Sequence, residues 1–219
     1  MTRLVLASAS PARLSVLRAA GVEPVVRVSD VDEDAVADAL PLGTDEDTVV
    51  IELARAKARA VLMRLADDPA FLDDDGFPND DYVVVGCDSM LSIAGQLQGK
   101  PLTADSARQR WSTMAGQSGR LLTGHCVLRP RPDGDVAEAA ACSATTVHFG
   151  APAPAELDAY LATGEPLQVA GAFTLDGYGG WFVERIEGDP SSVIGIGLPL
   201  LRSLLAEVEL SVDRLWAAR

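Results

Sequence analysis

LVLASASPAR, residues 4–13, decides the fold, because an apolar strand passes through a loop of small residues directly into the start of a helix. Ser10 is a good N-cap and Pro11 suits the first helical position. We therefore predict a helix from Ala12 to about Ala20, ended by Gly21. The free N–H groups and the positive dipole end of that helix would face whatever lies above the loop, which is the geometry of a phosphate site.

Arg13 lies in the first turn of this predicted helix, where a cation opposes the macrodipole and is mildly unfavourable. A nearby anion would remove that cost, so Arg13 favours a phosphate site. An ordinary capped helix after a first strand explains the same segment equally well. Other parts of the chain have to decide between the two.

The 219 residues, 48% of them hydrophobic, can bury a core as one large domain or as two closely packed lobes. The net charge of −14 argues against binding to a nucleic-acid polymer or to an anionic membrane surface. The sequence has no run of 18 apolar residues and no signal-peptide pattern, so we expect a cytoplasmic protein.

Cysteine and histidine are too few for several kinds of site. The three cysteines form no CxxC pair, which supports neither a disulfide framework nor a zinc knuckle. We expect the two histidines, His125 and His148, to be structural. A small anionic substrate would therefore need a local basic cluster, a metal ion or both.

Apolar runs alternate with helical periodicity along the chain. They predict strands at about 25–29, 82–85, 121–128, 140–149 and 181–186, and helices at about 44–65, 104–114, 154–162 and 198–205. The alternation, with hairpins in the middle, indicates an α/β fold with a mixed central β-sheet flanked by helices. We expect a single domain over residues 1–219, in which the Asp-rich segment at about 67–81 is a surface insertion without chemistry.

Lys57 lies in the middle of the apolar stripe of the helix predicted at 44–65, whereas Arg55 and Arg59 point away from that stripe. The stripe consists of Val50, Leu53, Ala54, Lys57 and Val61. A lysine on a buried face either extends its ammonium to the rim of the core or ends in a cleft beside an anionic partner. Both alternatives stay open.

Asp88 follows the apolar strand at 82–85, and strand ends are where open α/β sheets place their ligands. Its carboxylate would serve as a metal ligand or a general base, or else as the cap of a turn. Asp32 and Glu33 would help to hold a hard cation such as Mg²⁺, which prefers oxygen ligands. A solvated acidic turn explains this pair equally well.

Lys100 lies on a constrained turn between Gly99 and Pro101. Together with Arg13 and Lys57 it would supply three cations for a polyphosphate, although an ordinary surface lysine is the alternative. The sequence contains no G-x-x-x-x-G-K-[ST] and no G-x-G-x-x-G after a strand. Their absence disfavours a P-loop and a dinucleotide-binding site.

Nine short motifs follow one another along the chain. They are Ser8-Ala9-Ser10-Pro11-Ala12-Arg13, Val31-Asp32-Glu33, Ala56-Lys57-Ala58, Gly86-Cys87-Asp88-Ser89, Gly99-Lys100-Pro101, Thr123-Gly124-His125, Gly164-Glu165-Pro166, Ala170-Gly171-Ala172-Phe173, and Ile186-Glu187-Gly188 with Gly197-Leu198-Pro199-Leu200. In order and spacing they resemble the Maf family over nearly the whole chain.

The resemblance implies a fold related to the inosine triphosphate pyrophosphatases, with two lobes around a cleft. It also implies hydrolysis of nucleoside triphosphates between the α and β phosphates, which releases a nucleoside monophosphate and pyrophosphate. The implied cofactor is a divalent metal, Mg²⁺ or Mn²⁺. The role to be expected is house-cleaning of non-standard or pyrimidine nucleotides.

The resemblance further implies a role for each matching residue. Asp88 would be the catalytic acid–base residue and, with Glu33, would bind the metal. The residues that would bind phosphate are Ser8, Ser10, Arg13, Lys57 and Lys100. The residues that would shape base selectivity are Ala12, Ser89 and Asp176.

The three selectivity positions depart from the branch that acts on thymidine and uridine triphosphates. That branch has Arg in place of Ala12, Thr in place of Ser89 and Gln in place of Asp176, and an Asp-Lys pair in place of Gln168-Val169. An acid at position 176 is similar to the 7-methyl-guanosine triphosphate branch, because a carboxylate accepts hydrogen bonds from guanine N–H groups or favours a cationic methylated base. A 7-methyl-GTP pyrophosphatase is therefore the alternative assignment.

Two other functional classes compete with the enzyme. A non-catalytic nucleotide-binding regulator of septum formation and cell division would need no water-activating carboxylate, which disfavours it. An acidic structural or interaction protein would explain neither Lys57 nor the loop at 8–13. We expect a small-molecule triphosphate as the partner, no nucleic-acid polymer and no membrane, and leave a homodimer as an open option.

Overall fold

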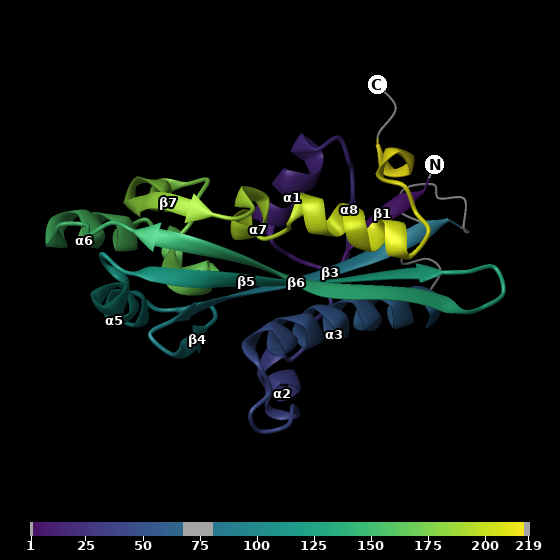
Figure 1. The fold of residues 1–219 in the computed structure, drawn as a ribbon, viewed down its shortest axis with the longest axis horizontal. Helices are drawn as coiled ribbons and strands as arrows, with labels where there is room; N and C mark the ends of the chain where they lie inside the picture. The colour runs from purple at the N-terminus through teal and green to yellow at the C-terminus, as the bar shows by residue number, and fades with distance from the viewer. Residues whose placement is uncertain (1, 68–80, 217–219) are drawn as a thin grey trace. The chain divides into compact units, whose positions relative to one another are not determined.

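The computed structural model describes residues 2–67 and 81–216 (Figure 1). The acidic insertion predicted at about 67–81 lies outside the described residues, apart from Asp67 and Asp81 at its two ends. Within the described residues no helix combines the length and the apolar character needed to cross a membrane.

The centre of the fold is a seven-stranded sheet in the order β2-β1-β3-β5-β6-β7, with β4 paired to β3. The strands are β1 (Arg3–Leu6), β2 (Val25–Val26), β3 (Tyr82–Ile93), β4 (Gln96–Gln98), β5 (Ser118–Pro130), β6 (Val136–Phe149) and β7 (Val183–Glu187). β1 is parallel to β2 and β3, whereas the pairs β3·β4 and β6·β7 are antiparallel. The predicted α/β class with a mixed sheet is confirmed.

The helices are α1 (Pro11–Ala19), α2 (Glu33–Asp38), α3 (Glu46–Asp67), α5 (Ala104–Met114), α6 (Pro154–Ala162), α7 (Pro190–Ile194) and α8 (Leu198–Glu207). Short 3₁₀ helices are η1 (Glu165–Gln168), η2 (Ala170–Ala172), η3 (Tyr178–Phe182) and η4 (Val212–Leu215). The bounds predicted for α5 and α6 are confirmed. α2 and α7 were not predicted, and the strand expected from Trp181 begins only at Val183, because η3 occupies the residues before it.

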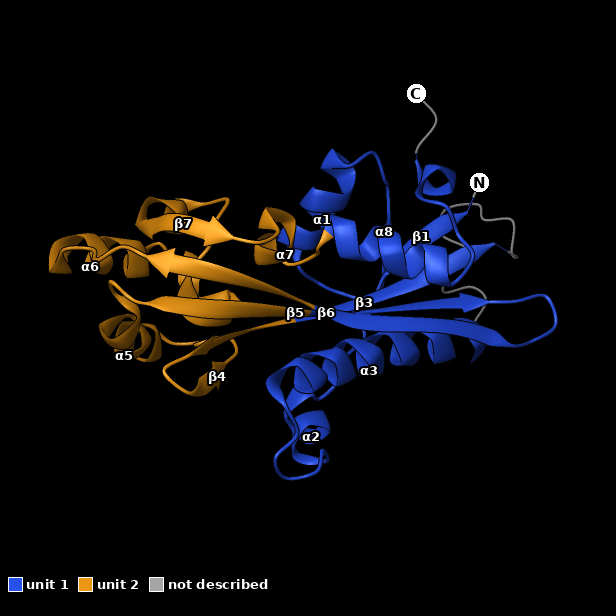
Figure 2. Ribbon diagram, viewed as in Figure 1, with its two compact units in different colours: residues 1–88, 124–142, 198–219 blue, residues 89–123, 143–197 orange. Residues whose placement is uncertain are grey.

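The chain forms two compact units (Figure 2). Unit 1 comprises residues 1–88, 124–142 and 198–219, and unit 2 comprises residues 89–123 and 143–197. β3, β5 and β6 each contribute residues to both units.

Unit 1 has α3 on one face of its strands and α1 and α8 on the other (Figure 1). Two glycines of the sheet let the backbone of α3 pack closely against it. A Cβ on Gly86 would come within 2.2 Å of the Ala54 carbonyl oxygen, and a Cβ on Gly124 within 2.1 Å of the Val50 carbonyl oxygen. Only glycine allows the helix backbone to approach β3 and β5 this closely.

Unit 2 is organised around the buried indole of Trp111. Its Nε1–H donates to the Ala172 carbonyl at 2.8 Å, so its one polar group is satisfied. Phe149, Tyr160 and Phe182 surround the ring with centroid separations of 5.8, 6.3 and 5.9 Å in edge-to-face geometry. Such aromatic pairs stabilise the core beyond the area that they bury.

The close contact between α3 and Gly86 makes a testable prediction. Gly86→Ala places a methyl group against helix backbone that no rotamer change can move, so we expect the free energy of unfolding to fall by about 1–3 kcal/mol. Urea denaturation measures the change. The matched control is Gly150→Ala, whose new methyl would meet nothing closer than 3.6 Å. An equal loss of stability in both variants would contradict a special role of Gly86 in packing α3 against β3.

Candidate active site

The loop between β1 and α1 has the predicted capping geometry. The Ser10 hydroxyl accepts a hydrogen bond from the Arg13 N–H at 3.4 Å, and Pro11 takes the first helical position. The Ser8 hydroxyl accepts from the Ser10 N–H at 3.2 Å and is itself buried. The helix begins at Pro11 rather than at Ala12, one residue earlier than predicted.

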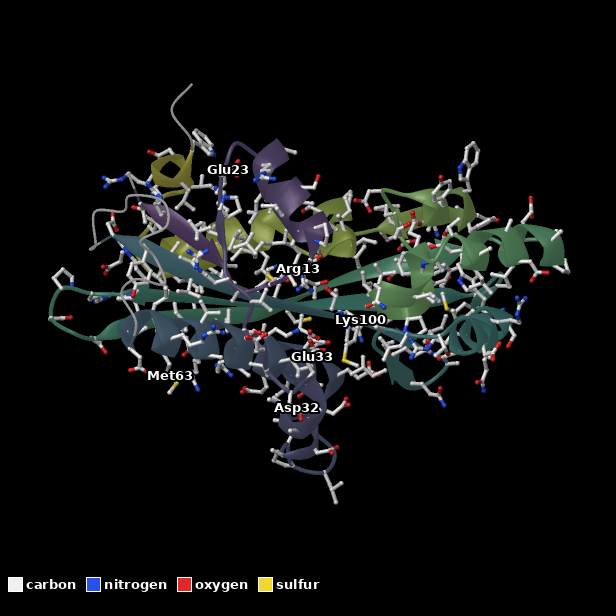
Figure 3. The ribbon with its side chains drawn as sticks, turned by 180° about the vertical axis from the view of Figure 1, so that it is seen from behind. Arg13, Glu23, Asp32, Glu33, Met63 and Lys100 are labelled. Atoms are coloured by element: carbon white, nitrogen blue, oxygen red, sulfur yellow. The ribbon has the colours of Figure 1, made fainter. Side chains whose placement is uncertain are left out.

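Arg13 is buried rather than exposed on the surface of α1 (labelled in Figure 3). Its Nη1 donates to the Ser8 hydroxyl at 2.9 Å and to the Cys87 carbonyl at 2.8 Å. The guanidinium therefore joins the loop after β1 to the residue that precedes Asp88. This contact accounts for a cation in the first turn of a helix, and its action on phosphate stays a prediction.

Asp88 was predicted to follow a strand that ends at Val85, but β3 runs on to Ile93 and Asp88 lies within it. The repeat of this strand and that of α3 bring Asp88 and Lys57 together. Side chains two residues apart in a strand share a face, so Asp88 is directed, like the Gly86 position, toward α3. On α3, Lys57 lies one turn beyond Ala54, which rests on Gly86. Lys57 Nζ forms ion pairs with Asp88 Oδ1 and, at 2.7 Å, with Glu33 Oε1.

Lys57 thus ends beside anionic partners, which decides between the two alternatives for it. The residue is only 7% exposed and Asp88 only 5%. A buried carboxylate and a buried ammonium compensate each other, and either alone would be costly. Arg55 and Arg59 lie off the buried stripe, as predicted, but both pair with Glu138 of β6.

Burial raises the pKa of Asp88 above its ordinary value, although the positive charges of Lys57 and Arg13 oppose the shift and Glu33 adds to it. A carboxylate with a raised pKa is a stronger base than a solvated one. Burial also raises the pKa of the neighbouring Cys87 thiol to about 11, so this cysteine stays protonated at neutral pH. The titratable group with base chemistry here is the carboxylate of Asp88.

Asp32 and Glu33 have different roles. The Asp32 carboxylate caps α2 by accepting the Ala35 N–H at 3.0 Å, whereas the exposed Glu33 side chain forms an ion pair with Lys57. Figure 3 labels Asp32 and Glu33. Glu33 and Asp88 therefore offer oxygens to one common point. Their donor set fits a hard divalent cation that keeps water and substrate phosphate in its shell. Within residues 2–67 and 81–216 no cluster of three or more His, Cys, Asp or Glu side chains forms a metal site.

The Lys100 turn lies in unit 2, where Arg110 of α5 holds its backbone. The Arg110 guanidinium donates to the carbonyls of Gly99 and, at 3.5 Å, of Lys100, while the Gly171 N–H also donates to Gly99 at 3.3 Å. The Lys100 side chain is exposed. Arg110 was not predicted from the sequence, because no motif marks an arginine that binds backbone carbonyls ten and eleven residues earlier.

Ser89 takes part in a directed chain of hydroxyl groups in unit 2. The Thr123 hydroxyl donates to the Ser192 carbonyl at 2.9 Å, so it is the acceptor in its 3.1 Å contact with the Ser89 hydroxyl. The Ser89 oxygen has lone pairs that can accept a hydrogen bond from a ligand.

The remaining selectivity residues belong to different units. Ala12 is the second residue of α1 in unit 1, and Asp176 is an exposed residue of the loop before η3 in unit 2. The structure brings together Ser8, Arg13, Glu33, Lys57 and Asp88 within unit 1, with Ser10 next to Ser8. It describes Ser89, Lys100 and Asp176 within unit 2.

The family model for "Maf-like protein" matches residues 3–208. The chain belongs to the Maf family. This Maf protein is 69% identical to a protein of Nocardia farcinica over 97% of its own length and 96% of the relative. It is 65% identical to a protein of Rhodococcus jostii, covering 100% and 98% of the two chains, and 56% identical to one of Mycolicibacterium smegmatis, covering 100% and 99%. Each of these relatives bears the name nucleoside triphosphate pyrophosphatase.

The raised pKa of Asp88 makes the stability of this Maf protein depend on pH. The folded chain holds the Asp88 proton more tightly than the unfolded chain, whose pKa is near 3.8. The stabilisation is present below pH 3.8 and is lost as the pH rises through the folded pKa. We expect the free energy of unfolding of the native protein, minus that of Asp88→Asn, to fall across this window.

Urea denaturation between pH 4 and pH 8, with a chelator present, measures this difference. Asp105→Asn, which removes an exposed carboxylate of α5, is the control for the same substitution outside the site. A difference that is flat or rises with pH in Asp88→Asn would contradict a raised pKa.

Proposed function

We propose that this Maf protein hydrolyses nucleoside triphosphates between the α and β phosphates and releases a nucleoside monophosphate and pyrophosphate. One observation carries the proposal: a buried carboxylate, Asp88, is ion-paired to a buried lysine and lies directly after the carbonyl that Arg13 binds. The names of the relatives from Nocardia, Rhodococcus and Mycolicibacterium support the same reaction.

We propose that Glu33 and Asp88 hold a divalent cation, Mg²⁺ or Mn²⁺. When bound, such an ion polarises phosphate oxygens and lowers the pKa of a coordinated water. Both carboxylates already share one cation, the ammonium of Lys57. Lys57 would then turn from the carboxylates to the phosphates, where its charge opposes the charge of the leaving pyrophosphate.

The other residues of the site have separate tasks in this mechanism. The free N–H groups at the start of α1 and the hydroxyls of Ser8 and Ser10 would bind phosphate oxygens, and Arg13 would add its charge. Lys100 would neutralise charge on the polyphosphate. Asp88 would take a proton from the attacking water, since burial makes it a better base.

The composition of the chain supports the two lysines as functional residues. Only two of its 18 basic side chains are lysines, Lys57 and Lys100, and the others are arginines. The ammonium of a lysine is a compact point charge that can exchange partners, whereas the planar guanidinium of an arginine forms bidentate pairs with a fixed geometry. A sequence that uses arginine everywhere else has lysine at both positions where a charge would have to move to a phosphate.

A non-catalytic nucleotide-binding regulator remains the second candidate from the sequence. Burying Asp88 carries a desolvation cost, and a protein that only binds a triphosphate needs no carboxylate that activates water. The buried Asp88 therefore favours the enzyme. A cytoplasmic setting, a homodimer and a house-cleaning role stay predictions.

The reaction predicts the effect of removing the Asp88 charge. Asp88→Asn keeps the shape of the side chain, so kcat for pyrophosphate release should fall by about 100-fold or more. The exposed Asp105→Asn is the matched control and should keep normal turnover. Substrate binding is checked separately in both variants. Bound triphosphate should slow the reaction of Lys57 and Lys100 with an amine-reactive reagent, which mass spectrometry measures. A folded Asp88→Asn protein with near-normal turnover would contradict the assignment.

We propose that Ala12, Ser89 and Asp176 shape base selectivity, with a preference for guanine-type bases over thymine and uracil. The hydroxyl of Ser89, which contacts Thr123, and the carboxylate of Asp176 can both accept hydrogen bonds from a ligand. Guanine offers a ring N–H and an amino group on one edge. Uracil and thymine offer one N–H between two carbonyls, which two acceptors match less well.

The triple variant Ala12→Arg, Ser89→Thr and Asp176→Gln tests this selectivity. It should move relative kcat/KM toward thymidine and uridine triphosphates by ~10- to 100-fold, because an unpaired buried polar group costs about 1–3 kcal/mol. The measurement compares uridine, thymidine, guanosine and 7-methyl-guanosine triphosphates in both proteins. An unchanged ranking would mean that these side chains do not contact the base.

A further inference from the structure

The carboxylate of Glu165, at the start of η1, lies inside the loop of residues 174–179. Its Oε1 accepts the Thr174 hydroxyl at 2.5 Å and the Gly179 N–H at 3.0 Å, and its Oε2 accepts the Tyr178 N–H at 3.0 Å. The Gly179 N–H also reaches the Thr174 hydroxyl at 3.1 Å. One carboxylate therefore closes the loop from both ends.

The loop packs tightly around this carboxylate, with no space for a Cβ at two of its glycines. A Cβ on Gly177 would lie 2.4 Å from Glu165 Oε2 and 3.0 Å from Oε1. The backbone of Gly177 is extended, with φ of −133°, so only the space taken by Glu165 requires a glycine. A Cβ on Gly179 would in turn lie 2.5 Å from the Thr174 nitrogen.

Glu165 carries its charge at neutral pH. Burial alone would raise its pKa, but the hydrogen bonds from Thr174, Tyr178 and Gly179 lower the pKa below its ordinary value. Two of these donors are backbone N–H groups, which need an acceptor when they are kept from water. Charge-assisted hydrogen bonds of this kind are stronger than neutral ones.

Asp176 lies at the exposed part of the same loop, between the two ends that Glu165 fixes. In the described part of the chain no hydrogen bond or ion pair holds its carboxylate. Its location in space is therefore set by the loop backbone alone. Whatever fixes residues 174–179 also fixes the direction in which Asp176 presents its charge.

We infer that Glu165 is a positioning residue for nucleoside selection: its carboxylate fixes the loop 174–179 and thereby orients Asp176 toward the base. Glu165 itself touches neither the base nor the reacting phosphates. The inference rests on the proposed function in one respect, that Asp176 meets the nucleoside. It adds the residue on which this selection depends.

Glu165→Gln tests the inference, because a carboxamide has one acceptor oxygen and would turn its NH₂ group toward the loop N–H donors. Gly177→Ala disturbs the same contact from the other side without changing a charge. The controls are Glu184→Gln, at an exposed glutamate of β7, and Gly150→Ala, where nothing lies within 3.6 Å of the new methyl. Thermal unfolding verifies that each variant is folded.

The primary readout is binding of α,β-methylene triphosphates of guanosine, 7-methyl-guanosine, uridine and thymidine by calorimetry. We expect Glu165→Gln and Gly177→Ala to weaken binding of the preferred analogue by ~10-fold and to reduce the differences in Kd among the four bases. In turnover assays the loss should lie in KM, with kcat within about threefold of normal. Hydrogen exchange of the Tyr178 and Gly179 amides should speed up in these two variants and in neither control.

A double-mutant cycle separates positioning from a general loss of packing. In an Asp176→Asn background, Glu165→Gln should change the ranking of the four analogues no further, since its effect passes through Asp176. Faster amide exchange with an unchanged ranking, or equal effects of Glu165→Gln in both backgrounds, would overturn the inference. If the native protein binds the analogues with a base preference but hydrolyses no triphosphate, the proposed reaction fails while the cycle still decides on Glu165.

Discussion

The ion pair of Lys57 with Asp88 and Glu33 is the interaction on which the site depends. It forms because a glycine in β3 lets α3 come close enough for a lysine side chain to stay within the layer between helix and sheet. A bulkier residue at that glycine would separate the ammonium from both carboxylates. The burial that raises the pKa of Asp88, and the charges that oppose it, thus arise from one backbone contact.

Sequence alone predicted the parts of the structure that follow from local patterns. α5 and α6 match in both bounds because each has a recognisable start, Thr103 or Pro154, and enough length to show a stripe. Lys57 faces inward as its place in the apolar stripe of α3 indicated. α2 and α7 have only six and five residues, too few for a helical period, and only their Asp caps mark them.

The loop of Ser8 and Ser10 was predicted from a strand end and a helix start, whereas Asp88 was expected after a strand and lies within β3, because an apolar run of four residues did not show how far the strand continues. Residues that act across the chain were missed. Arg110, Thr123 and Glu165 bind backbone groups or hydroxyls of other segments, and no spacing in the sequence reveals such contacts. The Ser89 hydroxyl was expected at a selectivity position, but its direction is set by Thr123, 34 residues further along. Polar networks of this kind become visible only when the strands are paired.

The internal pairing of charges has a consequence for how a nucleotide arrives. Arg13 and Lys57 are matched by Asp88 and Glu33, so this cluster presents almost no net field to solvent, while the whole chain carries −14. A triphosphate therefore approaches a protein whose net charge repels it at long range, and Lys57 attracts it only once its ammonium has left the carboxylates. Added salt screens the repulsion over about 8–10 Å and should speed the encounter, the reverse of electrostatic steering.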